Sequence, residues 1–393
     1  MRLRSRLTVI LLVVVGLSVA GGALGQSGGQ ETVSGVENTT NKLSLADPAA
    51  DGHATAGIDV GTAVAADAHR LAGLHDRLTL EERISQAEDP VARATIREAV
   101  RGAEDRVAGL RAERGELLAA HGDGELSTAT LASELVRLNA AADRERALLD
   151  RLAEFDTDSE IPFPNVAENL TALETTESLL GQPALEQLEA AAAGATNRQA
   201  AYVQTSPDGL VVATVSEEYV RQAFLSSERN RTGANRFADG ASPGWSAAIE
   251  RANGIYPWAF ANEPSISGIR TGDVYRIDIG HPHGSLEALF DGATTNVFHE
   301  HQFAAPEDVS VAAVETATTD GVELRVAVTH ATGPIRVSVA EDGQPVADAT
   351  VTIGGRAVGQ TDENGELRLI QPDGPFEVSA TTPGGTTVSV VGA

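Results

Sequence analysis

Residues 96–117 read IREAVRGAEDRVAGLRAERGEL, and apolar side chains recur in this stretch at alternating steps of four and three residues. This spacing keeps the apolar side chains on one narrow seam of an α-helix, and it produces a left-handed supercoil when two such helices pair. The stretch therefore predicts a coiled-coil helix. The members of the seam are, in order, Ile96, Val100, Ala103, Val107, Leu110, Arg114 and Leu117.

The same spacing continues on both sides of this stretch, beyond short breaks at Asp89-Pro90 and at residues 121–124. Because the breaks are short, consecutive helices should lie antiparallel, so residues 58–156 are predicted to form an antiparallel helical hairpin or a three-helix coiled coil. The seam then either closes within the chain, which the short breaks favour, or binds a partner. The flanking seam residues are Val60, Val64, Asp67, Leu71, Leu74 and Leu78 before the stretch, and Leu131, Leu135, Leu138, Ala142, Glu145, Leu149 and Leu152 after it.

Three of these seam positions, Asp67, Arg114 and Glu145, are charged. A polar group in a seam either fixes the register of the helices or lies at a solvated end of the seam. We expect the second arrangement here.

The N-terminal residues have the features of an export signal. Arg2, Arg4 and Arg6 precede an apolar run, and the small residues of Ala23-Leu24-Gly25 follow it. We therefore predict a signal peptide at residues 1–26 that is cleaved. The alternative is an uncleaved membrane anchor, because the apolar run is near the minimum length for a membrane span. Residues 27–57, rich in Ser, Gly, Thr, Asn and Ala, are predicted to be a flexible spacer.

Beyond the helices, the pattern changes to short strands. Residues 157–196 are expected to be a helical connector, and residues 197–332 an α+β, mostly β, domain with a hairpin turn at Pro207-Asp208-Gly209 and a helix at residues 217–228. In residues 333–393, short alternating strands separated by Gly-rich turns predict a small β-sandwich. The expected fold class is thus multidomain α + β: a helical hairpin or three-helix coiled coil, an α+β domain, and a small immunoglobulin- or prealbumin-like sandwich.

Two motifs near the C-terminus carry a family resemblance. Residues 343–353, GQPVADATVTI, are followed by residues 359–367, GQTDENGEL. Together they resemble the prealbumin-like carboxypeptidase regulatory-like repeat, which implies an accessory β-sandwich without catalytic residues of its own. The chain as a whole is similar to uncharacterised exported multidomain proteins of halophilic archaea, and that similarity implies no activity.

The composition excludes several classes of protein. The chain has no cysteine, which rules out disulfide frameworks, thiolate metal sites and thiol nucleophiles. Its formal net charge is −27, so binding to phosphate backbones is disfavoured and no nucleic acid is expected as partner. Apart from Lys42, every basic residue of the Lys and Arg group is arginine. An acidic, lysine-poor surface is typical of proteins adapted to high salt, where repulsion between carboxylates is screened.

Histidines form the one candidate site for chemistry. His281, His283, His299 and His301 lie within 21 residues, with Asp291 and Glu300 nearby. The two side chains of a His-x-His pair on a strand point to the same face, so two neighbouring strands bring together enough imidazoles for zinc or copper. The other outcome is four solvated or hydrogen-bonded histidines without metal, which we favour because residues 281–284 have the composition of a turn.

Phosphate-binding loops, nucleophile elbows and metalloprotease motifs do not occur in the sequence. We therefore expect an exported, non-enzymatic, modular cell-envelope protein of a halophile, with an interaction or structural role and no cofactor. Its partner would be a cell-envelope protein or polymer, and its oligomeric state is open. The alternative is a secreted metal-binding protein or metal-dependent hydrolase that uses the four histidines.

The charge generates a prediction about salt. If the acidity is an adaptation to brine, lowering the salt from molar to low millimolar concentration should unfold the chain, because carboxylate repulsion is no longer screened. Far-UV circular dichroism across this range measures the loss of structure. An unchanged spectrum would contradict the adaptation.

Overall fold

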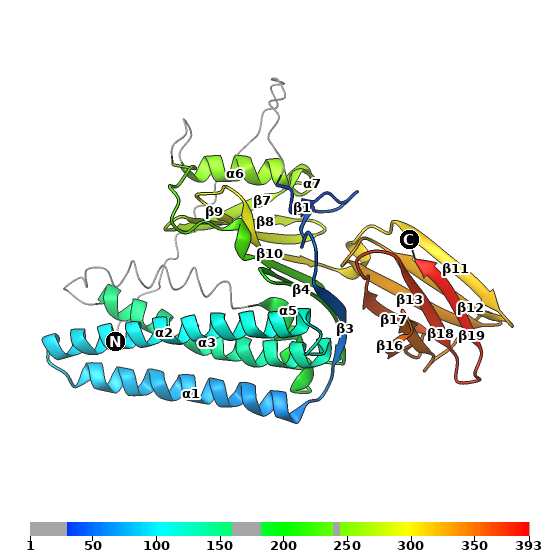
Figure 1. Ribbon diagram of the computed structural model, residues 1–393, viewed down its shortest axis with the longest axis horizontal. Helices are drawn as coiled ribbons and strands as arrows, with labels where there is room; N and C mark the ends of the chain where they lie inside the picture. The colour runs from blue at the N-terminus through cyan, green and yellow to red at the C-terminus, as the bar shows by residue number, and fades with distance from the viewer. Residues whose placement is uncertain (1–29, 159–181, 239–243, 393) are drawn as a thin grey trace, which may run out of the picture.

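The computed structural model describes residues 30–158, 182–238 and 244–392. The predicted signal peptide at residues 1–26 and the connector residues 159–181 lie outside the described residues. The described parts form a bundle of long helices, a curved sheet with helices on both faces, and a small β-sandwich beside the sheet (Figure 1). This arrangement confirms the predicted fold class.

Three long helices form the bundle: α1 (Val60–Ser85), α2 (Asp89–Gly122) and α3 (Thr128–Asp158). The seams of α2 and α3 close on each other, with Ile96, Val100 and Val107 buried against Leu149 and Leu152. Buried apolar side chains of this kind each contribute about 1.5–3 kcal/mol to stability.

Two of the charged seam residues do not lie at solvated ends, so our expectation for them was wrong. Glu145 is buried, and its Oε1 lies 2.8 Å from Nε of Arg106. Arg114 is also buried, with its guanidinium carbon 4.4 Å from the centre of the Phe224 ring. An ion pair compensates the first charge, and a cation–π contact with an aromatic ring from the sheet contributes to accommodating the second.

The sheet has eight antiparallel strands in the order β3-β4-β5-β6-β10-β9-β8-β7. In chain order, their bounds are β3 (Ala50–Ala56), β4 (Gln199–Ser206), β5 (Gly209–Val215), β6 (Tyr219–Leu225), β7 (Ser265–Thr271), β8 (Val274–His281), β9 (Gly284–Asp291) and β10 (Val297–Ala304). The strand β6 replaces the helix predicted at residues 217–228. It is buried along its whole length between β5 and β10, and this tertiary environment overrides the local preference for helix.

The predicted flexible spacer at residues 27–57 is corrected over its described part. Residues 30–57 contain β1 (Val33–Ser34) and β2 (Lys42–Leu43), which pair with each other, and β3, which forms the edge of the large sheet. β3 pairs with β4 from Ala50 opposite Thr205 to Ala56 opposite Gln199. Its polar composition is compatible with a strand because an edge strand is held by backbone hydrogen bonds and needs few apolar side chains.

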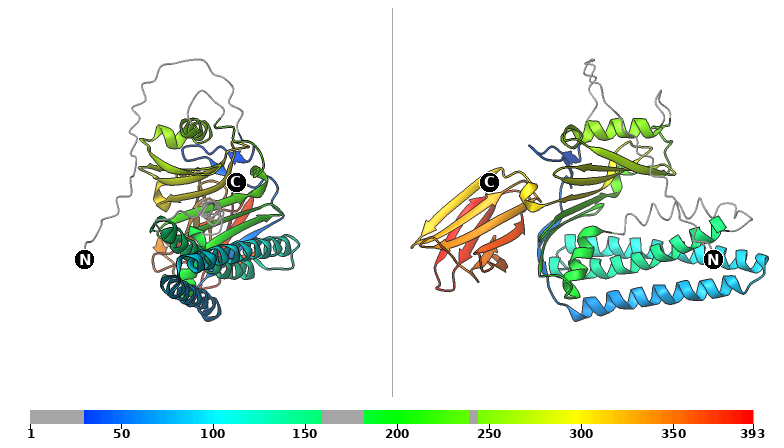
Figure 2. Two further views of the ribbon diagram at one scale, coloured as in Figure 1. Left: turned by 90° about the vertical axis from the view of Figure 1, so that its left-hand side faces the viewer. Right: turned by 180° about the vertical axis from the view of Figure 1, so that it is seen from behind.

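Each face of the sheet has its own cover (Figure 2). On one face, α3 and α5 (Pro183–Ala192) pack against β3–β6, with Val212 in the shared core. On the opposite face, α6 (Gly244–Ile255) and α7 (Pro257–Ala261) pack against β8, in a core that extends across the sheet as far as Val211 on β5. Neighbouring residues of one strand therefore belong to different cores, as the alternation of side chains requires.

The C-terminal sandwich is larger than expected. Its first sheet contains β11 (Ala313–Thr319), β12 (Val322–Val328), β13 (Pro334–Glu341), β14 (Gln344–Pro345) and β17 (Glu366–Ile370). Its second sheet contains β15 (Thr350–Ile353), β16 (Arg356–Gln360), β18 (Phe376–Thr381) and β19 (Thr387–Gly392). The boundary expected at residues 332/333 is wrong, because β12 pairs with β13 and supplies Val322, Leu324 and Val326 to the sandwich core.

A buried ion pair lies between the large sheet and the sandwich. Arg221 on β6 and Glu300 on β10 are both fully buried, with Nη1 of Arg221 2.9 Å from Oε1 of Glu300. Tyr256, at the junction of α6 and α7, donates a 2.6 Å hydrogen bond to Glu300 Oε2, which also accepts from the backbone N–H of Leu43 at 2.9 Å. Every oxygen of the carboxylate is therefore paired.

The guanidinium group of Arg221 binds three separate segments. Besides Glu300, it donates to the backbone carbonyl of Leu43 in β2 and, at 2.9 Å, to the hydroxyl of Thr332, in the chain that enters β13. The N-terminal strand, the sheet and the sandwich thus meet at one side chain.

Lys42 lies beside this ion pair and is buried, which corrects its expected place in a flexible spacer. Its ammonium group donates to the backbone carbonyl of Ala331. Burial, reinforced by the charge of Arg221, lowers the pKa of Lys42 to about 7. The usual pKa of lysine is about 10.4. The contribution of neutral Lys42 to the stability of the folded state is therefore fully present above about pH 10.4, and it is lost as the pH falls from there through 7.

The ion pair generates a prediction about stability. Arg221→Met should lower the free energy of unfolding by about 3–5 kcal/mol, because it leaves the Glu300 charge buried and unpaired. The double variant Arg221→Met/Glu300→Leu should recover most of that loss, since neither charge then remains. Denaturant unfolding at constant salt measures both.

A surface pair provides the matched control. Arg83 and Glu98 are 3.5 Å apart and mostly exposed, so Arg83→Met should change stability by less than about 1 kcal/mol. A double variant no more stable than Arg221→Met alone would contradict the account of the buried pair.

Candidate functional site

The four histidines lie on strands β8 and β10 and in the turn between β8 and β9, and they do not form one site. His281 ends β8, on the face that also carries Ile279, and His283 lies in the following turn. His301 on β10 stands opposite Glu287 of β9, on the other face of the sheet. The rings of His299 and His301 are 4.4 Å apart between centres, and those of His281 and His283 are 6.4 Å apart. Each pair is therefore brought together, while the register of β8, β9 and β10 separates the two pairs by the thickness of the sheet.

The first pair lies against Trp258 of α7. The centre of the His281 ring is 5.2 Å from that of the indole, and its Nε2 is 3.4 Å from the hydroxyl of Thr40. The cavity beside the pair has a volume of only about 20 Å³. Such a space holds about one water molecule, so it offers no room for a substrate.

The second pair faces the helical bundle. His299 is buried, packs edge-on against Phe224, and has no hydrogen-bond partner on either ring nitrogen. Burial, with the charges of His301 and Arg114 nearby, holds the pKa of His299 well below its usual range, so its ring is neutral. Nδ1 of His301 lies 3.2 Å from a carboxylate oxygen of Glu287. In residues 30–158, 182–238 and 244–392, no group of three or more histidine or carboxylate side chains is arranged to hold a metal ion.

A group of arginines lies near this second pair, and no continuous stretch of the sequence indicates it. Arg111 and Arg114 come from α2, and Arg229 follows the short helix η1 (Ser226–Glu228). The guanidinium carbon of Arg229 is 4.9 Å from the centre of the Phe298 ring, and its Nε is 3.8 Å from Asp291. Burial, together with the neighbouring arginines, lowers the pKa of Arg111 to about 10. Only the folding of α2 onto the sheet brings these charges together.

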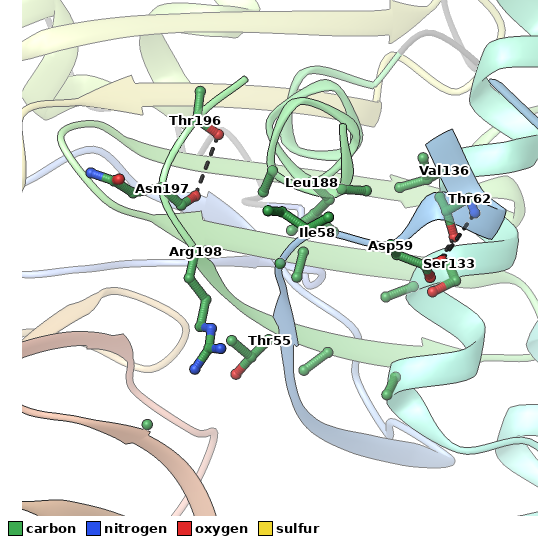
Figure 3. A pocket seen from close by; sticks show the side chains of 18 of the residues that line it. Thr55, Ile58, Asp59, Thr62, Ser133, Val136, Leu188, Thr196, Asn197 and Arg198 are labelled. Carbon is green, nitrogen blue, oxygen red and sulfur yellow. Dashed lines mark hydrogen bonds between the residues drawn. The ribbon is translucent and has the colours of Figure 1, made fainter. Parts of the chain in front are cut away.

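A cleft of roughly 1370 Å³ lies where the start of α1, α3, α5 and the sandwich strand β16 approach one another (Figure 3). Of the described residues that line it, Asp59 and Arg198 are the ionisable ones. Asp59 caps α1 and accepts hydrogen bonds from the backbone N–H of Thr62 at 3.2 Å and from its hydroxyl at 2.9 Å. These bonds lower the pKa of Asp59. The cleft has the size of a binding site, but its lining lacks the paired acid and base of a hydrolytic centre.

The apolar seam of α1 faces solvent. Its five large apolar residues are between 44% and 70% exposed, and Asp67, in the same seam, is 68% exposed. At 3.6 residues per turn, the seam lies within an arc of about 80°. The exposed apolar members are Val60, Val64, Leu71, Leu74 and Leu78.

A different face of α1 packs against the bundle. Its buried residues Ala66, Gly73 and Leu80 lie about 140° around the helix from the seam. A Cβ atom on Gly73 would stand 2.9 Å from the side chain of Arg144, so this glycine permits α3 to approach closely. Ion pairs between α3 and α1 hold the same side, with Arg151 Nε 2.8 Å from Glu81. Closure of the seam within the chain is therefore correct for α2 and α3 and wrong for α1.

Three family models match successive parts of the chain. Residues 6–197 match a domain of unknown function (DUF7096), residues 201–310 a family of unknown function (DUF7094), and residues 313–389 an archaeal fibronectin-III type-like domain. No curated protein and no solved structure matches the chain.

The third match begins where β11 begins and spans the whole sandwich core. It is a fibronectin-III type model, in place of the carboxypeptidase regulatory-like repeat that residues 343–367 resemble. The matches describe a modular chain with a C-terminal β-sandwich and are consistent with a multidomain archaeal protein.

The burial of His299 generates a prediction about acid. A buried neutral histidine lowers stability as the pH falls below 6.5, because the unfolded chain takes up a proton that the folded chain excludes. His299→Phe should remove this component and reduce the loss of stability between pH 7 and pH 5 by roughly 2 kcal/mol. Denaturant unfolding at both pH values measures it.

His299→Leu repeats this test with a smaller side chain, and His75→Phe on the exposed face of α1 is the control. Equal loss of stability in the wild type and in both His299 variants would contradict the prediction.

Proposed function

We propose that this chain is an exported, non-enzymatic, modular protein of the cell envelope of a halophile, and that its helical bundle binds a protein partner. Its modular construction supports this role, with a bundle that projects on one side of the sheet and a sandwich on the other (Figures 1 and 2). The basic and apolar N-terminal residues support export, and the acidic composition supports a saline environment.

The exposed seam of α1 is the observation that carries the proposal. Five of the eleven exposed large apolar residues in the described part of the chain lie on this one helical face. Contiguous exposed apolar surface on a soluble protein marks an interaction site, because leaving it in water is unfavourable. The helix is held firmly on its other side, so the seam is presented without any rearrangement of the bundle.

The alternative of a metal-dependent hydrolase is not favoured by the geometry. The two histidine pairs occupy opposite faces of the sheet, and the ionisable groups of the large cleft are an engaged helix cap and a single arginine. In the parts of the chain that the structure covers, no helix has the length and apolarity to span a bilayer. Membrane attachment through a retained signal would depend on residues 1–26.

Cell fractionation and co-purification in the native host test the proposal. We expect the chain in the envelope or medium fraction, with an N-terminus that sequencing places after the signal. Proteins that co-purify at high salt with the tagged wild type, an untagged copy of this chain counted among them, should be lost with Leu71→Gln/Leu78→Gln and kept with Val91→Gln, which replaces an exposed residue outside the seam. Retention of the chain in the cytoplasm would overturn the location, and an identical set of co-purifying proteins would overturn the role of the seam.

A further inference from the structure

The apolar seam of α1 has the periodicity of a coiled-coil face with nothing packed on it. Val64, Leu71 and Leu78 recur every seven residues, and Val60 and Leu74 fill the alternate heptad positions. A flat surface such as a membrane requires a broad apolar face, whereas a strict heptad seam of this narrow kind fits another helix. The occupant that the seam best fits is therefore a helix with the same spacing.

The seam is complementary to itself when reversed. Its steps of four, three, four, three and four residues are the same in both directions, so an antiparallel copy aligns every member with another member. Val60 then stands opposite Leu78 of the second copy, and Val64 opposite Leu74. At each end of the contact, two valines of one copy thus face two leucines of the other. This is the self-complementary contact that a twofold dimer needs.

The charged residues of α1 favour this antiparallel register. Asp67, the one charged member of the seam, would stand opposite Leu71 of the second copy, one residue from its Arg70. Within one chain Asp67 already pairs with Arg70, which also contacts Glu189. A parallel pair in register would instead stack Asp67 on Asp67, and like charges in facing positions are destabilising.

We infer that α1 pairs with α1 of a second copy of this chain, antiparallel and centred near Asp67 and Leu71, to form a twofold dimer. The inference deepens the proposed function, on which it rests, by naming the partner of the seam. The contact spans 19 residues, or about 28 Å of helix, with five apolar side chains from each copy. A helix-to-helix contact of this length is small for a stable interface, so the dimer should dissociate in the micromolar range.

Sedimentation equilibrium of the purified full chain in molar salt tests the association. We expect a monomer–dimer equilibrium, with a dissociation constant raised at least tenfold by Leu71→Gln/Leu78→Gln and unchanged by Val91→Gln. Since all three residues are exposed, the variants should keep the far-UV spectrum of the wild type. A wild type that stays monomeric at all concentrations, or a dimer that the double variant leaves intact, would overturn the inference.

The absence of cysteine allows a direct test of the register. A mixture of Val64→Cys and Leu74→Cys chains should form a disulfide-linked pair on mild oxidation, because these positions face each other in the antiparallel dimer. Leu74→Cys alone should not, since its two copies lie far apart. Efficient self-linking of Leu74→Cys would show a parallel pair and overturn the inference.

The two proposals fail in different ways. The association is measured on purified chain, whereas export and partner binding are measured in the cell. A monomeric chain that is exported and loses its co-purifying proteins with the seam variant would overturn self-pairing and leave the proposed function standing.

Discussion

The arrangement of the molecule depends on one buried ion pair, between Arg221 and Glu300. Taking two charges out of water costs several kcal/mol per ion, and the mutual attraction of the pair compensates this only when further hydrogen bonds satisfy both groups. Here those bonds come from β2, from the junction of α6 and α7, and from the chain that enters the sandwich. The pair is therefore satisfied only when all of these segments are in place, which ties together parts of the chain that are distant in sequence.

The bundle shows how much a periodic pattern predicts. The heptad spacing correctly predicted long antiparallel helices and the contact between α2 and α3. It did not predict which face of α1 packs against the bundle. That face is determined by the small residues Ala66 and Gly73, which permit close approach, and by ion pairs with α3. A periodic pattern of apolar residues identifies a surface that is favourable to bury. It does not determine which element packs on that surface, because this depends on the fit of side chains elsewhere in the bundle.

In the sheet, by contrast, local composition led to two wrong predictions, a flexible spacer in place of β3 and a helix in place of β6. β3 is polar because it is an edge strand, and β6 has mixed character because it is buried between two strands. The two histidine pairs lie apart for a related reason. Alternation correctly places His299 and His301 on one face of β10, but it does not apply to His283, which lies in a turn. Whether the two pairs share a face depends on the register of three strands. Register is a property of the whole sheet and cannot be deduced from a single short segment.

The burial of Lys42 has a consequence for the chemistry of the surface. A chain with a single lysine, whose ammonium group is enclosed beside Arg221 and bonded to Ala331, presents amine-directed reagents with no accessible ε-amine in its folded state. Because only 6% of Lys42 is exposed, its acylation is expected to be slow while the junction between the sheet and the sandwich is closed and fast when that junction opens. The rate at which this one residue becomes modified therefore measures how often that junction opens, and the molecule carries its own probe of the contact that holds its modules together.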